Sequence, residues 1–190
     1  GDLVEIWGPL GNGFPIPQTE RLILVAGGIG QTPFLATGRE ALGKRRYGNP
    51  QRDAGNRVQE LTMCYGARSA DSLAGLEDFA SAGISVQVAT DDGSRGVKGF
   101  VTSLLEAELQ RDAERPWVYC CGPEPMLAAV AKLAVQYGQP SEVSMERTMG
   151  CGLGGCYSCV VPVKSADGQT RYVRSCIGGP VFDGATVAWD

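Results

Sequence analysis

Four cysteines near the end of the sequence have a spacing that can bind iron. Cys151, Cys156 and Cys159 form a C-x4-C-x2-C run, and Cys176 follows after 16 intervening residues. This is the plant-type ligand arrangement of a [2Fe-2S] cluster, for which three thiolates must converge from one tight loop. Glycines in and beside the loop supply backbone conformations that residues with a Cβ resist: Gly150, Gly152, Gly154 and Gly155. The spacing therefore predicts a [2Fe-2S] cluster held by the four cysteines.

Two other interpretations of the same cysteines stay open. A structural zinc site usually has two close cysteine pairs, whereas only Cys156 and Cys159 form such a pair here. Alternatively, the four cysteines are buried or disulfide-bonded without any metal. The sequence has no histidine, which excludes imidazole ligands, Rieske-type ligation and histidine-dependent nucleophiles. Any metal must therefore be bound by thiolate or carboxylate.

A glycine-rich turn after the first predicted strand has the features of a phosphate site. Its sequence is Gly27-Gly28-Ile29-Gly30-Gln31-Thr32-Pro33, which departs from G-x-G-x-x-G because Pro33 takes the place of the third glycine. Proline suits the first turn of a helix, where free N–H groups and the helix dipole favour an anion. A glycine turn between a strand and a helix is also common without a ligand, so the motif alone is weak.

Three further loops follow the carboxyl ends of predicted strands. They are Tyr65-Gly66-Ala67-Arg68, Thr90-Asp91-Asp92-Gly93-Ser94 and Cys121-Gly122-Pro123-Glu124-Pro125-Met126. Ligands of open parallel sheets bind at this edge, so we expect a nucleotide cleft there. Arg68 is either a phosphate ligand or a surface cation. The two aspartates would repel phosphate, so they are expected to bind ribose or to shape their loop, and a turn that satisfies its own backbone explains them equally.

The elements that carry these loops alternate along the chain, as in a parallel sheet built from βαβ units. Strands are predicted at residues 21–26, 61–65, 85–89, 117–121 and 142–145. Helices are predicted at residues 32–44, 72–82, 102–111 and 125–137, and exposed loops at 46–57 and 90–98. The run at 21–26 is continuously apolar, as expected for a strand buried on both faces. The predicted fold class is therefore α/β, with a Rossmann-like domain.

The pattern changes at both ends of this alternating region. Residues 1–17 contain an alternating strand at 3–7 and then a Gly- and Pro-rich linker, which predicts the end of a preceding segment that is missing. Residues 18–145 form the predicted nucleotide-binding domain. Residues 146–190 form the predicted cluster domain, with a hairpin of strands at 160–164 and 170–173 and a last strand at 186–189.

Composition restricts the class of protein. The 190 residues include 43% hydrophobic and 20% charged side chains, which is typical of a folded globular chain. The net charge of −4 comes without a basic block, which argues against nucleic acid as a partner. No apolar run approaches the length of a membrane span. Seven cysteines without a signal peptide favour a reducing, cytoplasmic location.

The order of the motifs resembles the electron-transfer subunit of class B dihydroorotate dehydrogenase, within the ferredoxin-reductase superfamily. The resemblance rests on GGIGxTP, YGAR, TDDGSxGxxGxVT, CGPEPM, MxCGxGxCxxC and CxxGPVF, and it covers nearly the whole chain. It implies an NAD-binding domain, a C-terminal [2Fe-2S] domain and a preceding flavin-binding β-barrel, whose Arg-x-Tyr-Ser signature is absent here. A second departure is Gly178, where relatives often have Asp before the Gly-Pro pair.

The resemblance also implies roles for residues. CGPEPM closes on the nicotinamide, so Cys121 is expected near the face of hydride transfer, while Gly122, Pro123 and Met126 contact the cofactor. The alternative for Cys121, and more so for Cys64 and Cys120, is a small apolar residue at a buried strand end. FAD is expected to be held mostly by the missing barrel, and capped by residues 11–14 and the region of Glu146.

The implied function is electron transfer. NADH gives up two electrons as a hydride whereas a [2Fe-2S] cluster carries one, so a flavin is needed between them. The expected partner is an FMN-containing dihydroorotate dehydrogenase catalytic subunit, in a heterotetramer. The alternatives are small subunits of a sulfide dehydrogenase, of an NADH-dependent ferredoxin-NADP oxidoreductase or of a glutamate synthase-like enzyme, and a redox-sensing iron-sulfur module without turnover. NAD and NADP both stay open, because Arg68 or Arg95 could contact a 2′-phosphate.

Overall fold

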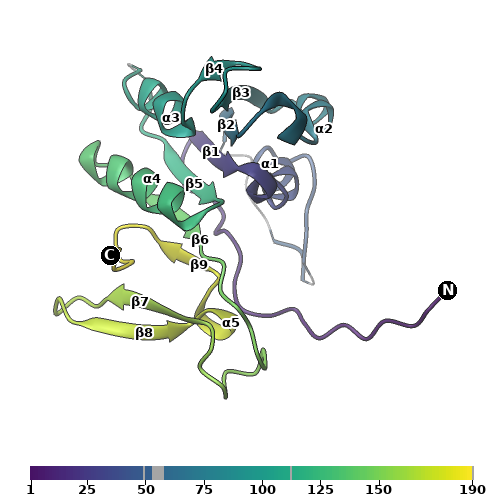
Figure 1. The fold of residues 1–190 in the computed structure, drawn as a ribbon, viewed down its shortest axis with the longest axis vertical. Coiled ribbons are helices and arrows are strands. Elements are labelled where there is room, and N and C mark those ends of the chain that lie inside the picture. Colours follow the sequence, from purple (N-terminus) through teal and green to yellow (C-terminus); the bar gives the residue numbers. More distant parts are fainter. Residues whose placement is uncertain (49, 53–57, 112, 190) are drawn as a thin grey trace.

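Most strands of the molecule belong to one twisted sheet. The computed structural model describes residues 1–48, 50–52, 58–111 and 113–189. In this described part, seven strands lie in the order β4-β3-β2-β1-β5-β6-β9 (Figure 1). Their bounds are β1 (Arg21–Gly27), β2 (Glu60–Ala67), β3 (Ser85–Thr90), β4 (Val97–Lys98), β5 (Trp117–Cys121), β6 (Ser141–Ser144) and β9 (Val181–Asp183). Neighbouring strands are parallel except for β9, which is antiparallel to β6. The predicted parallel α/β fold is confirmed.

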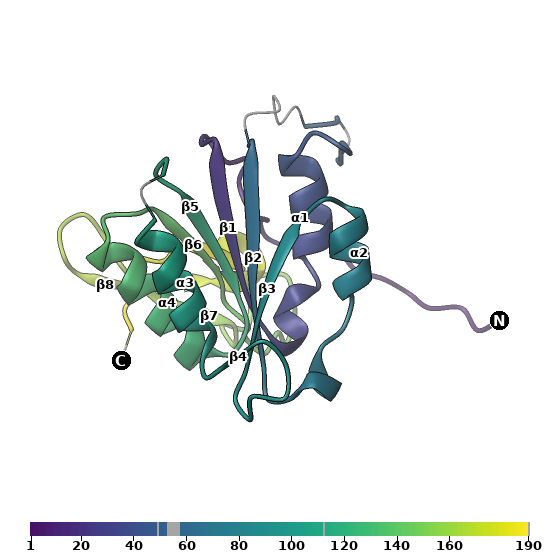
Figure 2. The same ribbon diagram turned by 90° about the horizontal axis from the view of Figure 1, so that it is seen from above.

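Helices cover both faces of the sheet (Figure 2). The helices α1 (Phe34–Ala41) and α2 (Leu76–Ser81) lie on one face, and α3 (Val101–Leu109) and α4 (Glu124–Gln136) lie on the other. Short 3-10 turns occupy η1 (Gly28–Gln31) and η2 (Ala70–Ser72). All seven residues of β1 are buried, because alternate side chains of a strand point to opposite faces and both faces are covered.

The core divides accordingly into two clusters. Leu22 and Leu24 pack with the α1 and α2 side, whereas Ile23 and Val25 pack with the α3 and α4 side. Phe14 from the segment before β1 belongs to the first cluster and stacks on Tyr119, with ring centroids 4.9 Å apart. The continuous apolar run in the sequence therefore corresponds to the centre of the molecule.

The C-terminal part combines a separate hairpin with one strand of the main sheet. The hairpin consists of β7 (Val160–Lys164) and β8 (Thr170–Arg174), and the one-turn helix α5 (Ser175–Gly178) follows it. The chain then adds β9 to the edge of the main sheet. Among the described residues, no helix is both long and apolar enough to cross a bilayer.

Several predicted elements were wrong or shifted. The strand expected at residues 3–7 is not formed: this segment is extended, exposed and unpaired within the described chain, so its alternation has no neighbouring strand to stabilise it. The strand expected at 186–189 is reduced to a single bridge between Val187 and Val163, and β9 takes the sheet edge instead. The helix expected at 72–82 begins only at Leu76, after the left-handed Gly75.

Candidate functional site

A large cavity lies at the carboxyl edge of the sheet, where the strand order reverses between β1 and β5. Its volume is about 1380 Å³, large enough for a dinucleotide-sized ligand. Predicted site residues that line it are Gly27, Gly28, Gly30, Thr32, Tyr65, Gly66, Arg68, Asp91, Cys121, Gly122, Pro123 and Met126. The loops that sequence reasoning assigned to one edge therefore share one cavity.

The turn after β1 and the turn after β5 touch each other at the base of this cavity. A Cβ on Gly30 would lie 2.2 Å from the carbonyl oxygen of Cys121, and one on Gly27 would lie 2.6 Å from the sulfur of Met126. Only glycine allows this approach of the two backbones. The glycines thus bring the GGIG turn against the CGPEPM turn.

Three predicted residues lie outside the cavity lining. Pro33 is the N-cap of α1, behind the glycine turn. Thr90 is fully buried, and its hydroxyl donates to the carbonyl of Arg95 at 2.8 Å. The Asp92 carboxylate accepts hydrogen bonds from the backbone and hydroxyl of Ser94, which lower the pKa of Asp92. Thr90 and Asp92 therefore shape the loop that presents Asp91 to the cavity.

Sequence reasoning did not propose several residues that line the cavity. Phe100 is the most conspicuous, with 75% of its surface exposed beside the cavity. Its signal in the sequence was an aromatic residue directly before a helix at the ligand-binding edge. Ser144, Arg147 and Met149 were not proposed either, and they line the cavity together with Glu146, whose region was expected to cap FAD. All four belong to the segment that leads to Cys151.

Cys121 is half-buried at the end of β5, opposite Ser144 in the β5–β6 register. Burial raises the pKa of its thiol, a hydrogen bond with Ser144 opposes the shift, and the Glu146 carboxylate adds to it. Cys121 is therefore a neutral thiol near pH 7. Cys64 and Cys120 are fully buried, as the structural alternative expected, and burial raises the pKa of Cys64 to about 12.

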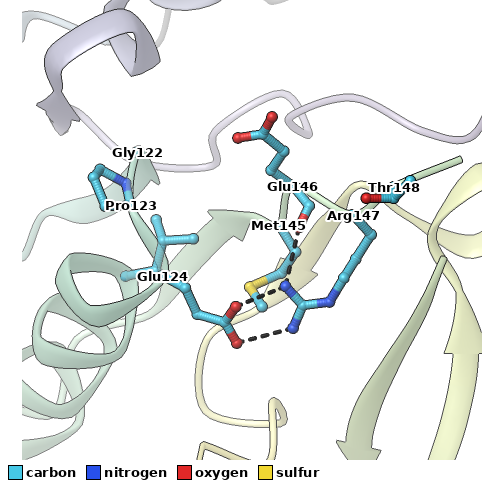
Figure 3. Close-up of a pocket in the computed structure, with 8 residues that line it drawn as sticks. Gly122, Pro123, Glu124, Met145, Glu146, Arg147 and Thr148 are labelled. Atoms are coloured by element: carbon cyan, nitrogen blue, oxygen red, sulfur yellow. Dashed lines mark hydrogen bonds and ion pairs between the residues drawn. The ribbon is translucent and has the colours of Figure 1, made fainter.

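A smaller cavity of about 360 Å³ adjoins this region (Figure 3). The Arg147 guanidinium donates to both carboxylate oxygens of Glu124, at 2.7 and 2.9 Å, and to the carbonyl of Glu146 at 3.0 Å. The hydrogen bond from Arg147 lowers the pKa of Glu124. This ion pair ties the first turn of α4 to the segment that leads to the cysteine loop.

The four predicted cysteine ligands lie in one region, as two pairs. A hydrogen bond with Cys151 is among the contacts that lower the pKa of Cys156, and the backbone N–H of Cys176 donates to the Cys159 sulfur at 3.5 Å. Within the described residues, no three metal-binding side chains surround a single ion position. Two thiolates bind each iron of a two-iron cluster, and the pairing of Cys151 with Cys156 and of Cys159 with Cys176 fits that pattern.

Hydrogen-bond donors already surround these sulfurs. Backbone N–H groups of Leu153 and Cys176 donate to the sulfurs of Cys151 and Cys159, at 3.3 and 3.5 Å. The Ser158 hydroxyl lies 3.1 Å from the Cys156 sulfur and is the main cause that lowers the pKa of Cys156 to about 6. Such contacts stabilise thiolates, the form that binds metal.

Two family models match separate parts of the chain. Residues 146–188 match the family model described as the iron-sulfur cluster binding domain of dihydroorotate dehydrogenase B. Residues 24–132 match the oxidoreductase NAD-binding domain.

Full-length relatives and a solved structure extend the similarity to nearly the whole chain. A dihydroorotate dehydrogenase B (NAD(+)) electron transfer subunit from Geobacillus kaustophilus is 39% identical over 96% of this chain, which spans 64% of that relative's length. The subunit of the same name from Desulforamulus reducens is 35% identical, with 100% of this chain and 67% of the relative covered. A solved NADH-dependent reduced ferredoxin-NADP oxidoreductase, studied for flavin-based electron bifurcation, superimposes with a TM-score of 0.76 at 32% identity. That comparison covers 98% of this chain and 60% of the other.

Proposed function

The chain belongs to the family of dihydroorotate dehydrogenase B electron transfer subunits, and on this basis we propose that it passes electrons between NAD, FAD and a [2Fe-2S] cluster. Its partner is a catalytic subunit that contains FMN and oxidises dihydroorotate in pyrimidine biosynthesis, in a cytoplasmic heterotetramer. The main support for this proposal is that one segment connects the two sites directly. Residues 144–147 and Met149 line the large cavity, and Cys151 follows two residues later. Nucleotide and cluster sites thus adjoin in one chain.

The cofactors supply the redox chemistry, and the protein positions them. When bound, FAD exchanges a hydride with the nicotinamide and single electrons with the cluster. Cys151, Cys156, Cys159 and Cys176 are the proposed cluster ligands. Phe14 is buried in the core, so of the segment 11–14 that was expected to cap FAD, only residues 11–13 are exposed for such a contact. Glu146 is exposed and lines the cavity, which supports its proposed contact with FAD.

Different parts of the cavity lining suit different parts of the proposed dinucleotide. The backbone of residues 27–32 precedes α1, where N–H groups favour the pyrophosphate. Exposed Phe100 offers a face on which adenine can stack. Asp91 lines the cavity and is suited to bind a ribose hydroxyl, and its charge disfavours a 2′-phosphate. We therefore propose NAD rather than NADP.

Cys121 contacts the nicotinamide in this arrangement. Its thiol is neutral, small and half-buried, so it provides a contact surface rather than a nucleophile. Ser144 holds the thiol through the hydrogen bond between β5 and β6. The CGPEPM turn, fixed against Gly27 and Gly30, gives this contact a defined position.

The test uses the full-length protein with its partner subunit, purified without air. Cys156→Ser should abolish transfer between NADH and the partner while NADH still bleaches the flavin. Cys64→Ala, which removes a buried sulfur far from the cysteine loop, is the control and should retain both reactions. Unchanged transfer in Cys156→Ser, or a colourless protein that contains zinc, would overturn the proposal.

A subunit of an NADH-dependent ferredoxin-NADP oxidoreductase is the second candidate, because the solved structure of such an enzyme matches 98% of the chain. The two candidates differ in the electron donor that the complex accepts. Flavin reduction by dihydroorotate supports the first candidate, and flavin reduction by reduced ferredoxin supports the second.

A further inference from the structure

The side chain of Arg174 contacts both segments that separate the three clustered cysteines. Its Nη1 donates to the carbonyl oxygen of Gly154 at 2.7 Å, and Gly154 lies between Cys151 and Cys156. Its guanidinium carbon lies 4.9 Å from the ring centroid of Tyr157, the residue that follows Cys156. Arg174 is also the last residue of β8, two positions before Cys176. One side chain therefore joins the three-cysteine loop to the segment that carries the fourth cysteine.

The loop needs such support because one of its residues with a side chain has an unfavourable backbone. Tyr157 has a φ of 57°, whereas the φ of 78° at Gly154 is readily adopted by glycine. A non-glycine residue in this region costs free energy and persists only where its surroundings hold it. The planar guanidinium provides a stacking surface for Tyr157 and a fork for the Gly154 carbonyl.

The charge of Arg174 is not neutralised by a carboxylate. Within the described residues, no Asp or Glu forms an ion pair with it, whereas Arg147 pairs with Glu124 and Arg171 pairs with Asp167. A guanidinium group carries a full positive charge. A full positive charge therefore lies on the loop whose sulfurs are the proposed ligands.

We propose that Arg174 is a positioning residue of the cluster site, which clamps the ligand loop and raises the reduction potential of the cluster. The proposal rests on the proposed function, because it requires the four cysteines to hold a [2Fe-2S] cluster. One-electron reduction, by the flavin or a chemical reductant, adds a negative charge to a site that four thiolates already make negative. A nearby cation stabilises the reduced form more than the oxidised form.

Arg174→Met and Arg174→Lys separate the two effects in full-length protein prepared without air. Arg174→Met should lower the midpoint potential, measured by EPR-monitored titration, and release the cluster to a chelator at least about tenfold faster. Arg174→Lys should keep a potential close to that of the wild type but still release the cluster faster, since an ammonium lacks the planar fork. Arg171→Met, which removes an exposed cation from the same strand, should change neither quantity.

Tyr157→Leu provides a test in which the arginine is retained. It should speed cluster release without lowering the potential, whereas Tyr157→Phe keeps the ring and should behave as the wild type. Equal potentials in Arg174→Met and Arg174→Lys would overturn the charge effect, and equal release rates in all variants would overturn the clamp. Absence of iron and sulfide from the wild-type protein is a distinct result, which overturns the proposed function itself.

Discussion

The side chain of Asn12 pairs with the backbone of Val181, 169 residues away. Its Nδ2 donates to the Val181 carbonyl and its Oδ1 accepts from the Val181 N–H, both at 2.9 Å. Val181 begins β9, whose other edge pairs with β6. Asn12 thus caps the free edge of the strand by which the C-terminal part joins the main sheet. Three distant parts of the sequence meet at this strand.

Asn12→Ala should destabilise the fold by roughly 1 kcal/mol, because the Val181 backbone loses two hydrogen-bond partners at a partly solvated position. A lower urea midpoint, at unchanged slope, is the expected measurement. Asn12→Asp keeps the acceptor but loses the donor, so its midpoint should lie between the other two. A midpoint of Asn12→Ala equal to that of the wild type would show that water replaces the amide without cost.

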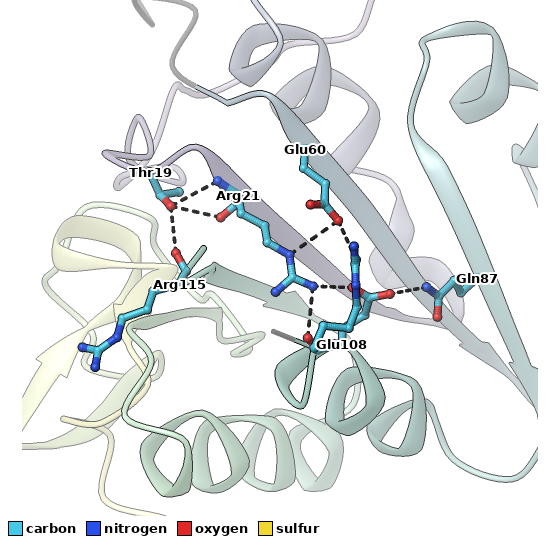
Figure 4. Close-up of polar contacts among 7 residues, drawn as sticks. Thr19, Arg21, Glu60, Gln87, Glu108 and Arg115 are labelled. Atoms are coloured by element: carbon cyan, nitrogen blue, oxygen red, sulfur yellow. Dashed lines mark hydrogen bonds and ion pairs between the residues drawn. The ribbon is translucent and has the colours of Figure 1, made fainter. Parts of the chain in front are cut away.

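A buried ion pair lies at the amino ends of the strands (Figure 4), whereas the large cavity lies at their carboxyl ends. Nη2 of Arg21 in β1 lies 2.5 Å from Oε2 of Glu108 in α3, and both side chains are buried. Burial raises the pKa of the Glu108 carboxyl, but hydrogen bonds from Arg111, Gln87 and Arg21 outweigh it and hold the pKa below the ordinary value. Glu108 is therefore ionised in the folded protein.

Glu108→Ala should cost about 3 kcal/mol of unfolding free energy at pH 7, because it leaves the Arg21 charge buried with less compensation. The depressed pKa of Glu108 means that its contribution is complete above the unfolded value of about 4.5 and is lost as the pH falls through the folded value. Urea unfolding at pH 7 and at pH 3.5 should therefore show a smaller difference between variant and wild type at the lower pH. A difference independent of pH would assign the effect to packing alone.

The sequence predicted those features that depend on local pattern. The apolar run of β1 and the glycines at 27–30 lie where expected, because burial on both faces and close backbone approach each leave a direct mark on residue type. The position of β9 was missed, since its pairing with β6 joins segments about 40 residues apart and depends on tertiary contacts. The exposure of Phe100 was missed because its signal, an aromatic residue directly before a helix, is equally compatible with a side chain buried in the core.

Glu142 in β6 lies directly opposite Asp183 in β9. Burial, and then the Asp183 charge, raise the pKa of Glu142 to about 7. Ionisation of Glu142 is therefore less favourable in the folded protein than in the unfolded chain. Its contribution to the free energy of unfolding falls as the pH rises from about 4.5 through 7. Glu142→Gln should raise the melting temperature relative to the wild type at pH 8, which corresponds to a gain in unfolding free energy on the order of 1 kcal/mol. At pH 4.5 the two proteins should have the same melting temperature. A gain of equal size at both values would contradict the assignment.

Asp91 and Asp92 are adjacent, yet only Asp91 lines the nucleotide cavity, while Asp92 is bonded to Ser94 within its own loop. Asp91→Ser should therefore reduce the preference for NADH over NADPH by about tenfold, since it removes the carboxylate that we propose contacts the ribose 2′ position. The measurement is the ratio of kcat/KM values for flavin reduction by the two nucleotides in the full-length protein.

Asp92→Asn is the matched control, because it removes the neighbouring charge but keeps an acceptor for Ser94, and its ratio should stay close to that of the wild type. If Asp92→Asn shifts the ratio as much as Asp91→Ser does, the discrimination comes from the general negative charge of the loop and not from the residue in the cavity.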